Sequence, residues 1–224
     1  PIPTYVVGAK IPITSDYTLE LPIYTSSAYT EDDYICFTET TSFSTDKWVK
    51  AIEVIPGNLS TVHHTLVYID TSNNNNSIQT DCMGVEGSLI AGYVPGTDPT
   101  IFPNGPDMKM GVKIPAGAKI TVQMHYPIGS GGTIDSTKIN FFFYPDNTPN
   151  IREVFNQALL ANWMLWIPAN SSPSFTSQYP TGNNTLNTDF SVLSVFPHMH
   201  LIGQEITSYA VGPTNDTIPF ERIT

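Results

Sequence analysis

The chain has 224 residues, of which 40% are hydrophobic and only 13% are charged, so it can bury a core in one large domain or in two smaller ones. Nine Lys and Arg residues stand against twenty Asp and Glu residues, and the net charge of -11 excludes nucleic acid as an expected partner because it would repel a phosphate backbone. No apolar run approaches the roughly 18 residues of a membrane-spanning helix, so no membrane span is expected.

Proline and glycine interrupt the chain at short intervals, and β-branched and aromatic residues fill the segments between them. This pattern is typical of antiparallel β-sandwiches, and no apolar stripe at the helical period of 3.6 residues accompanies it. Residues 1–30 are expected to wrap the surface as edge strands and loops. The predicted strands after them are, in chain order, 34–37, 48–55, 62–69, 120–126, 138–144 and 190–210.

The segment Pro145 to Asn150 combines two prolines with Asp, Asn and Thr, which makes it the best linker in the chain. We therefore place an N-terminal domain at residues 1–148 and a second domain at 149–224. The second segment is shorter than the roughly 100 residues of a full sandwich. It is expected to be the N-terminal part of a truncated domain.

The two cysteines, Cys36 and Cys82, lie on either side of a pair of adjacent histidines. They could form one disulfide or remain two buried thiols, and no Cys-x-x-Cys motif indicates zinc or thiol redox chemistry. The low share of charged residues, compensated by Ser, Thr, Asn and Gln, is typical of a secreted or periplasmic protein. This composition favours the disulfide.

All five histidines fall into three clusters, and each cluster is a candidate metal site. His198 and His200 form a His-x-His pair inside the predicted strand 190–210. Residues i and i+2 of a strand point to the same face, so the two imidazoles could act together as ligands of Cu, Zn or Fe. The alternative is a pair of surface or hydrogen-bonded histidines.

His63 and His64 are adjacent, and adjacent residues of a regular strand point to opposite faces. Both can reach one ion only if the strand bends or bulges there; otherwise one belongs to the core and the other is exposed. His125 shares a strand face with Gln123, so an imidazole ligand with a neighbouring amide to orient it is one interpretation. A hydrogen-bonded core histidine is the other.

Three strings taken together resemble the copper type II, ascorbate-dependent monooxygenases, the family of peptidylglycine α-hydroxylating monooxygenase and dopamine β-monooxygenase. The order and approximate spacing of His-His, Gln-x-His-Tyr and His-x-His match over about residues 60–224, and the match accounts for every histidine. The strings are TVHHTLVY at 61–68, QMHY at 123–126 and PHMHLIG at 197–203.

The resemblance implies an all-β chain of two jelly-roll-like antiparallel β-sandwich domains, each holding one copper ion in the full-length protein. His63, His64 and His125 would bind the electron-transfer copper, with Gln123 beside it. His198 and His200 would bind the catalytic copper, where O2 hydroxylates a C–H bond of a small organic substrate and ascorbate supplies the electrons. Tyr34 to Phe37, with Cys36, and Cys82 also resemble a family disulfide.

Two departures from the family pattern accompany this resemblance. The family's catalytic copper takes a third ligand, a methionine, from well downstream of His-x-His, and we expect this ligand to lie beyond Thr224; Met199 faces away from the pair on strand parity. Phe196 stands where the peptide-amidating member has the arginine that binds the substrate carboxylate. An apolar or aromatic substrate is therefore favoured over a peptidylglycine.

Other classes fit parts of the pattern. A cupin-like Fe or Mn oxygenase could use His198, His200 and Glu205, although Glu205 falls on the opposite face of a flat strand and the later cupin histidine is absent. A zinc hydrolase needs a carboxylate base beside its histidines, and no Asp or Glu lies within five residues of the first three. A non-catalytic copper-binding or adhesive β-sandwich protein is the strongest alternative.

Overall fold

The computed structural model describes residues 8–70, 77–162, 164–189, 191–199 and 202–224. Its described residues are all-β, with no helix, and the chain divides into two compact units, Pro1–Gln157 and Ala158–Thr224. Within the described part of the chain no helix has the length and apolarity needed to cross a membrane.

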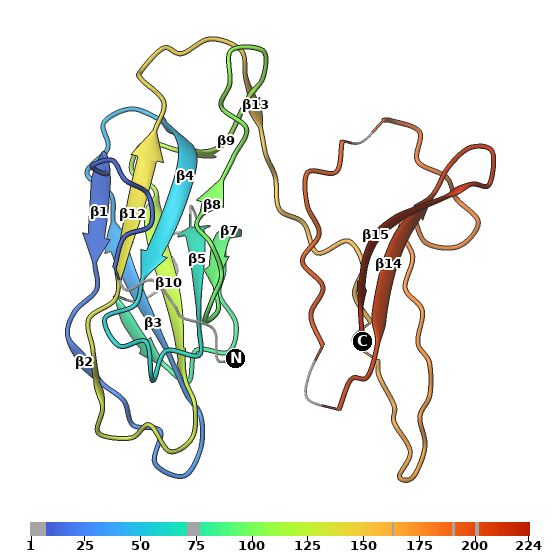
Figure 1. Ribbon diagram of the computed structural model, residues 1–224, viewed down its shortest axis with the longest axis horizontal. Helices are drawn as coiled ribbons and strands as arrows, with labels where there is room; N and C mark the ends of the chain where they lie inside the picture. Colours follow the sequence, from blue (N-terminus) through green and yellow to red (C-terminus); the bar gives the residue numbers. More distant parts are fainter. Residues whose placement is uncertain (1–7, 71–76, 163, 190, 200–201) are drawn as a thin grey trace. The chain divides into compact units, whose positions relative to one another are not determined.

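The strands of the first unit form two larger sheets and one small one (Figure 1). They are β1 (Tyr17–Glu20), β2 (Tyr24–Thr25), β3 (Asp33–Thr40), β4 (Lys47–Ile55), β5 (His64–Asp70), β6 (Ile78–Thr80), β7 (Ser88–Tyr93), β8 (Thr100–Ile101), β9 (Lys109–Ile114), β10 (Lys119–Tyr126), β11 (Ile134–Asp135), β12 (Lys138–Phe143) and β13 (Ile151–Glu153).

One sheet has the order β6-β3-β10-β5-β7, and the other has the order β1-β12-β4-β9-β13 with β8 paired to β4. The small sheet joins β2 to β11. Every pair in the first unit is antiparallel except β9 with β13, which run parallel. The predicted antiparallel all-β character of the chain is thus confirmed.

The two larger sheets contribute to a single hydrophobic core. Phe141 of β12 and Ile120 of β10 are both fully buried, although they belong to different sheets. Strand alternation places the apolar side chains on the inner faces, and burying each large one stabilises the fold by about 1.5–3 kcal/mol. The strands predicted near residues 34, 48, 120 and 138 all occur, with ends shifted by a few residues.

The proposed linker does not end the first unit. After it, β13 pairs with β9 through Ile151 and Glu153, and the Val154 N–H donates to the Gly111 carbonyl. These hydrogen bonds extend the first compact unit to Gln157, whereas the sequence places the boundary between residues 148 and 149. A proline-rich turn of this kind can also connect two strands of one sheet, as it does here between β12 and β13.

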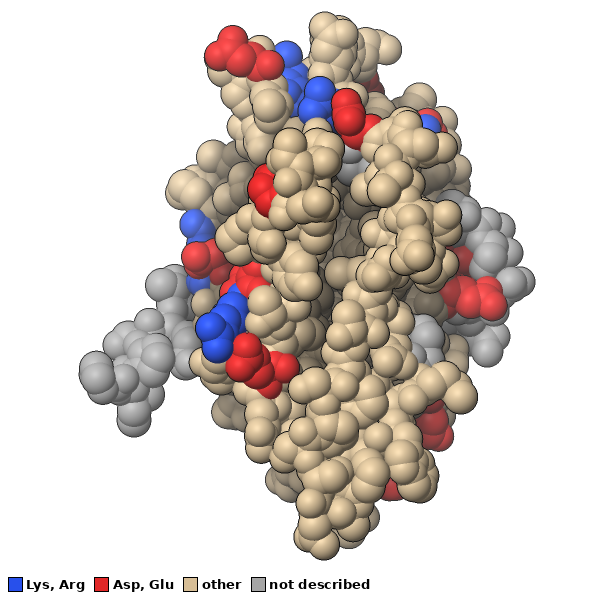
Figure 2. Space-filling model, turned by 90° about the vertical axis from the view of Figure 1, so that its right-hand side faces the viewer, with Lys and Arg blue, Asp and Glu red and all other residues tan. Residues whose placement is uncertain are grey.

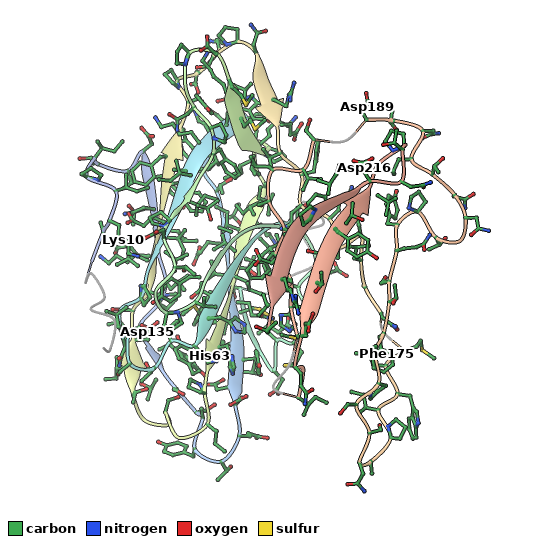
Figure 3. All side chains as sticks on the ribbon, turned by 45° about the vertical axis from the view of Figure 1, so that its right-hand side comes forward. Lys10, His63, Asp135, Phe175, Asp189 and Asp216 are labelled. Carbon is green, nitrogen blue, oxygen red and sulfur yellow. A yellow bond between two sulfur atoms is a disulfide. The ribbon has the colours of Figure 1, made fainter. Side chains whose placement is uncertain are left out.

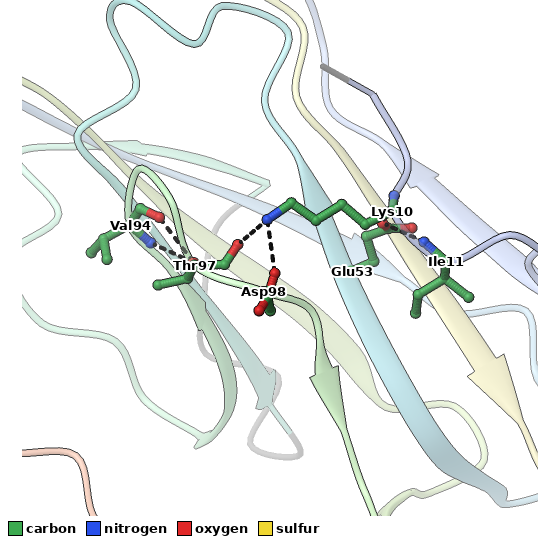
Figure 4. A network of polar contacts seen from close by, with 6 residues as sticks. All are labelled: Lys10, Ile11, Glu53, Val94, Thr97 and Asp98. Carbon is green, nitrogen blue, oxygen red and sulfur yellow. Dashed lines mark hydrogen bonds and ion pairs between the residues drawn. The ribbon is translucent and has the colours of Figure 1, made fainter. Parts of the chain in front are cut away.

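The segment before β1 is held against the sheet by a buried carboxylate. Glu53 of β4 is only 2% exposed, and it accepts hydrogen bonds from the backbone N–H groups of Lys10 and Ile11 (Figure 4). The Lys10 ammonium donates to the Thr97 carbonyl and pairs with Asp98. A buried charge needs such partners, so this network fixes the N-terminal segment on β4.

The described residues of the second unit form one antiparallel hairpin, β14 (Ile206–Val211) with β15 (Thr217–Ile223). The predicted strand 190–210 is wrong over most of its length, because the described residues 191–199 and 202–205 have no regular structure. Pro197 offers no backbone N–H to a neighbouring strand, and no described segment pairs with this stretch. Large apolar side chains such as Trp166 and Phe196 are correspondingly exposed.

Charged side chains are sparse on the surface, as the composition predicts. On the face drawn in Figure 2 they are scattered, and most of the face is formed by other residues. The acidic residues do not merge there into one continuous patch. Residues other than Lys, Arg, Asp and Glu therefore form most of this face, in agreement with the 13% share of charged residues.

Candidate metal centre

His63, His64 and His125 come together at one end of the five-stranded sheet. His64 is the first residue of β5 and lies opposite His125 of β10 in the antiparallel register. His63 precedes the strand, and its backbone N–H donates to the His125 carbonyl at 2.9 Å. Because β5 begins only at His64, the rule that adjacent strand residues face opposite ways does not decide where His63 points.

The imidazole nitrogens are spaced as ligands of one ion would be. The His64 Nδ1 atom lies 3.5 Å from His63 Nδ1 and 3.2 Å from His125 Nδ1. One ligand nitrogen from each of the three rings falls within 4.8 Å of the others. Two nitrogens bound tetrahedrally at about 2.0–2.1 Å from a shared ion are separated by about 3.3–3.4 Å, so the observed pairs fit a mononuclear site.

The three rings differ in their exposure to solvent. His125 is 5% exposed, His64 is half-buried and His63 is exposed. Tyr34 of β3 stacks on the His125 ring with a centroid distance of 4.1 Å and an interplanar angle of 8°. The site is therefore anchored on its inner side by packing and reaches the surface at His63.

Both faces of β10 are buried, although the alternation of apolar and polar residues along this strand indicates only one buried face. The inner face lies in the core, and the outer face carries Thr121, Gln123 and His125. Cys36 of β3 lies opposite Gln123, and its disulfide with Cys82 covers this part of the sheet. The Gln123 side chain donates to the Cys82 carbonyl at 2.6 Å, and this hydrogen bond ties β10 to the segment around Cys82.

The disulfide Cys36–Cys82 is present, and its Cα atoms are 5.8 Å apart. It is consistent with a protein that works outside the cytoplasm, where disulfides persist. Neither cysteine is therefore available as a thiolate ligand. The candidate metal shell in the first unit consists of imidazoles alone.

A carboxylate that the sequence did not connect with the histidines lies beside them. The Asp32 Oδ2 atom is 3.3 Å from His125 Nε2, while its Oδ1 atom accepts the Ile128 backbone N–H at 2.8 Å. That hydrogen bond is the largest cause of a lowered pKa for Asp32, and the neighbouring His125 adds to it. Burial is the largest cause of a lowered pKa for His125, and the charge of His63 acts in the same direction.

The turn that leads into His63 is fixed by a buried aspartate. Asp135 accepts hydrogen bonds from the Asn58 backbone N–H, the Tyr126 hydroxyl and the Thr137 hydroxyl. In Figure 3, Asp135 and His63 lie toward the same end of the first unit. Burial, followed by the charge of Asp135, strongly raises the pKa of Tyr126, so its hydroxyl remains a donor.

Glycine is required within this turn. A Cβ atom at Gly57 would collide with the backbone of Ser136, so the two segments approach as closely as they do only because position 57 has no side chain. Beyond it, the Asn58 carbonyl accepts the N–H groups of Thr61 and Val62. The chain therefore enters β5 along a fixed path.

We expect Asp135→Asn to destabilise the first unit by about 1–3 kcal/mol, because an amide cannot accept all of these hydrogen bonds and a buried donor is left unpaired. The free energy of unfolding in urea measures this loss. Asp146→Asn is the matched control, since Asp146 forms an exposed ion pair with Lys47. Its expected effect is at most about 1 kcal/mol. Equal losses in the two variants would contradict the role of Asp135.

The second predicted cluster is only partly described. His198 is exposed and lies in irregular backbone, and His200 lies outside the described residues, so the expected pairing of the two imidazoles has no structural account. Glu205, the carboxylate of the cupin interpretation, forms an ion pair with Arg222 at 3.1 Å. Phe196 is 68% exposed and Met164 is 88% exposed.

Three imidazoles, one of them exposed, can hold a first-row transition ion and leave a coordination position open to solvent. The buried Nε2 atom of His125 has no other hydrogen-bond partner and faces a carboxylate, as the outer nitrogen of a metal ligand commonly does. The donor set therefore fits copper, and equally zinc. A scan against protein-family models found no match to this chain, and neither did a search of curated proteins.

Proposed function

We propose that the chain belongs to a copper- and ascorbate-dependent monooxygenase and that His63, His64 and His125 hold its electron-transfer copper. The proposal rests chiefly on the convergence of these three imidazoles, which come from two segments more than 50 residues apart in the sequence. When bound, copper supplies one-electron redox chemistry between Cu(II) and Cu(I). His63 is exposed and gives a reductant such as ascorbate access to the site.

The proposed reaction is hydroxylation of a C–H bond of a small organic substrate by O2. Its catalytic copper would be held by His198 and His200 together with a methionine from elsewhere. The support for this part is the resemblance of residues 61–68, 123–126 and 197–203 to the copper type II monooxygenases. Two jelly-roll-like domains are part of the same proposal, and the two facing sheets of the first unit support it for that unit.

A non-catalytic copper-binding or adhesive protein is the second candidate, and one observation favours it. The only sheet among the described residues of the second unit is the β14–β15 hairpin, and His198 lies in irregular, exposed backbone. Such a setting does not preorganise a second copper site. In this case the three histidines of the first unit would form a redox or structural metal centre that does not serve catalysis.

Metal analysis of the intact protein distinguishes the candidates. Under copper-replete conditions we expect two copper ions per chain, together with O2 consumption that requires ascorbate. One copper ion without O2 consumption would favour the non-catalytic protein. One zinc ion, or no metal, would contradict both copper proposals. Because Cu(II) is paramagnetic and Zn(II) is not, the electron paramagnetic resonance signal and its loss on adding ascorbate identify the redox-active site independently of turnover.

A further inference from the structure

We propose that Asp32 is a positioning residue for the metal centre and that it selects the form of His125 in which the proton is on Nε2 and Nδ1 is free to bind metal. This inference rests on the proposed metal site and adds a residue that the histidine pattern does not contain. It is carried by the distance of 3.3 Å between Asp32 Oδ2 and His125 Nε2. The Nδ1 atom of the same ring faces His64.

The carboxylate is held in place before any metal binds. Its Oδ1 atom accepts the backbone N–H of Ile128, two residues beyond the end of β10, so Oδ2 is directed at the imidazole. The neighbouring Asp33 is buried and accepts hydrogen bonds from Tyr24 and Ser27 instead. Asp32 is therefore the one of the two carboxylates that faces the histidines.

The buried Nε2 atom of His125 lies within ion-pair distance of Asp32 but outside hydrogen-bond geometry, and it has no other partner. A neutral imidazole has one N–H, so a proton held at Nε2 leaves the lone pair of Nδ1 available. That Nδ1 atom is the one that lies 3.2 Å from His64 Nδ1, on the ligand side of the ring.

An amide at position 32 tests the role of Asp32 directly, because it reverses which nitrogen of His125 is favoured to carry the proton. In Asp32→Asn the side-chain oxygen is needed by the Ile128 N–H, so the NH2 group is turned toward His125. Two donors cannot face each other, and the imidazole proton is then favoured at Nδ1, where it blocks the metal. Asp32→Ala removes the acceptor without introducing an opposing donor, so its effect should be smaller.

We expect Asp32→Asn to weaken Cu(II) binding by about 10- to 100-fold in a competition titration with a chelator, and Asp32→Ala to weaken it less. Glu31→Gln is the matched control, since it removes the same charge from the adjacent exposed position and should leave the affinity unchanged. Unchanged affinity in Asp32→Asn would overturn the inference. So would equal losses in Asp32→Asn and Glu31→Gln, which would indicate a general effect of charge.

The tautomer itself is measured in the metal-free protein by long-range ¹H–¹⁵N correlation spectra of labelled histidine. We expect the proton of His125 on Nε2 in the wild type and on Nδ1 in Asp32→Asn. If the wild-type chain binds no copper, the proposed function fails while the spectra still decide the role of Asp32. If copper binds tightly and the tautomer is the same in both proteins, the inference fails and the proposed function stands.

Discussion

Replacing His125 with alanine is expected to abolish tight copper binding at the first site. His125 is the buried member of the three ligands, it stacks on Tyr34, and its ring is the only one of the three packed so closely into the sheet. Loss of a group that merely orients a ligand costs about 10- to 100-fold in affinity, so loss of the ligand itself should cost at least about 100-fold. A chelator competition titration measures the change.

The variant should retain copper at a second site if His198 and His200 form one, and it should lose the electron supply through the first. Reoxidation of the first site, followed by electron paramagnetic resonance, should then be undetectable. His198→Ala is the matched control, because it removes an imidazole from the other unit and should leave the first copper in place. Loss of both metal ions in the His125 variant would argue against two separate sites.

The sequence was sufficient to select the three histidines of the first unit but not to show how they meet. The cross-strand pairing of His64 with His125 depends on β5 lying beside β10, which no local pattern records. Strand parity opposed a site at His63 and His64, and it fails there because β5 begins at His64. Parity arguments hold only inside a strand, and strand ends are the positions that sequence patterns determine least well.

The sequence does not point to Asp32, because no Asp or Glu lies within five residues of His63, His64 or His125. It lies more than 90 residues from His125 in the chain, just before β3. Only the pairing of β3 with β10, in which Tyr34 lies opposite His125, brings Asp32 near the histidines. Asp32 thus supplies a carboxylate beside the histidines, as a zinc hydrolase would need. It lies at the outer nitrogen of His125, however, where it orients the ligand and is not placed as a base on the metal side.

In the second unit the sequence pattern predicts more strand than the described residues contain. Residues 190–210 are rich in apolar side chains and are predicted as a strand, yet among the described residues of this range only Ile206 to Ala210 belong to a strand, β14. An apolar run becomes a strand when a partner strand satisfies its backbone N–H and C=O groups. The described residues supply no such partner before Ile206. The pairing of His198 with His200 on one strand face therefore stays a prediction.

Removing the disulfide should have the largest effect on the stability of the first unit. The bridge closes a loop of 46 residues between Cys36 and Cys82, and the chain-entropy relation gives about 4 kcal/mol for a loop of this length. We expect the double variant Cys36→Ala, Cys82→Ala to lose about that much free energy of unfolding in urea. In the wild type, thiol titration of the unfolded, unreduced chain should find no free thiol.

A hydrogen bond also links the disulfide segment to the strand that carries His125. Gln123 shares the outer face of β10 with His125, and its amide donates to the Cys82 carbonyl, so the segment around Cys82 covers the row of polar side chains next to the ligands. Gln123→Leu separates the two contributions, because it removes this hydrogen bond and keeps the disulfide. A loss in the double variant no larger than in Gln123→Leu would contradict the entropic role of the bridge, since only the covalent link restricts the unfolded chain.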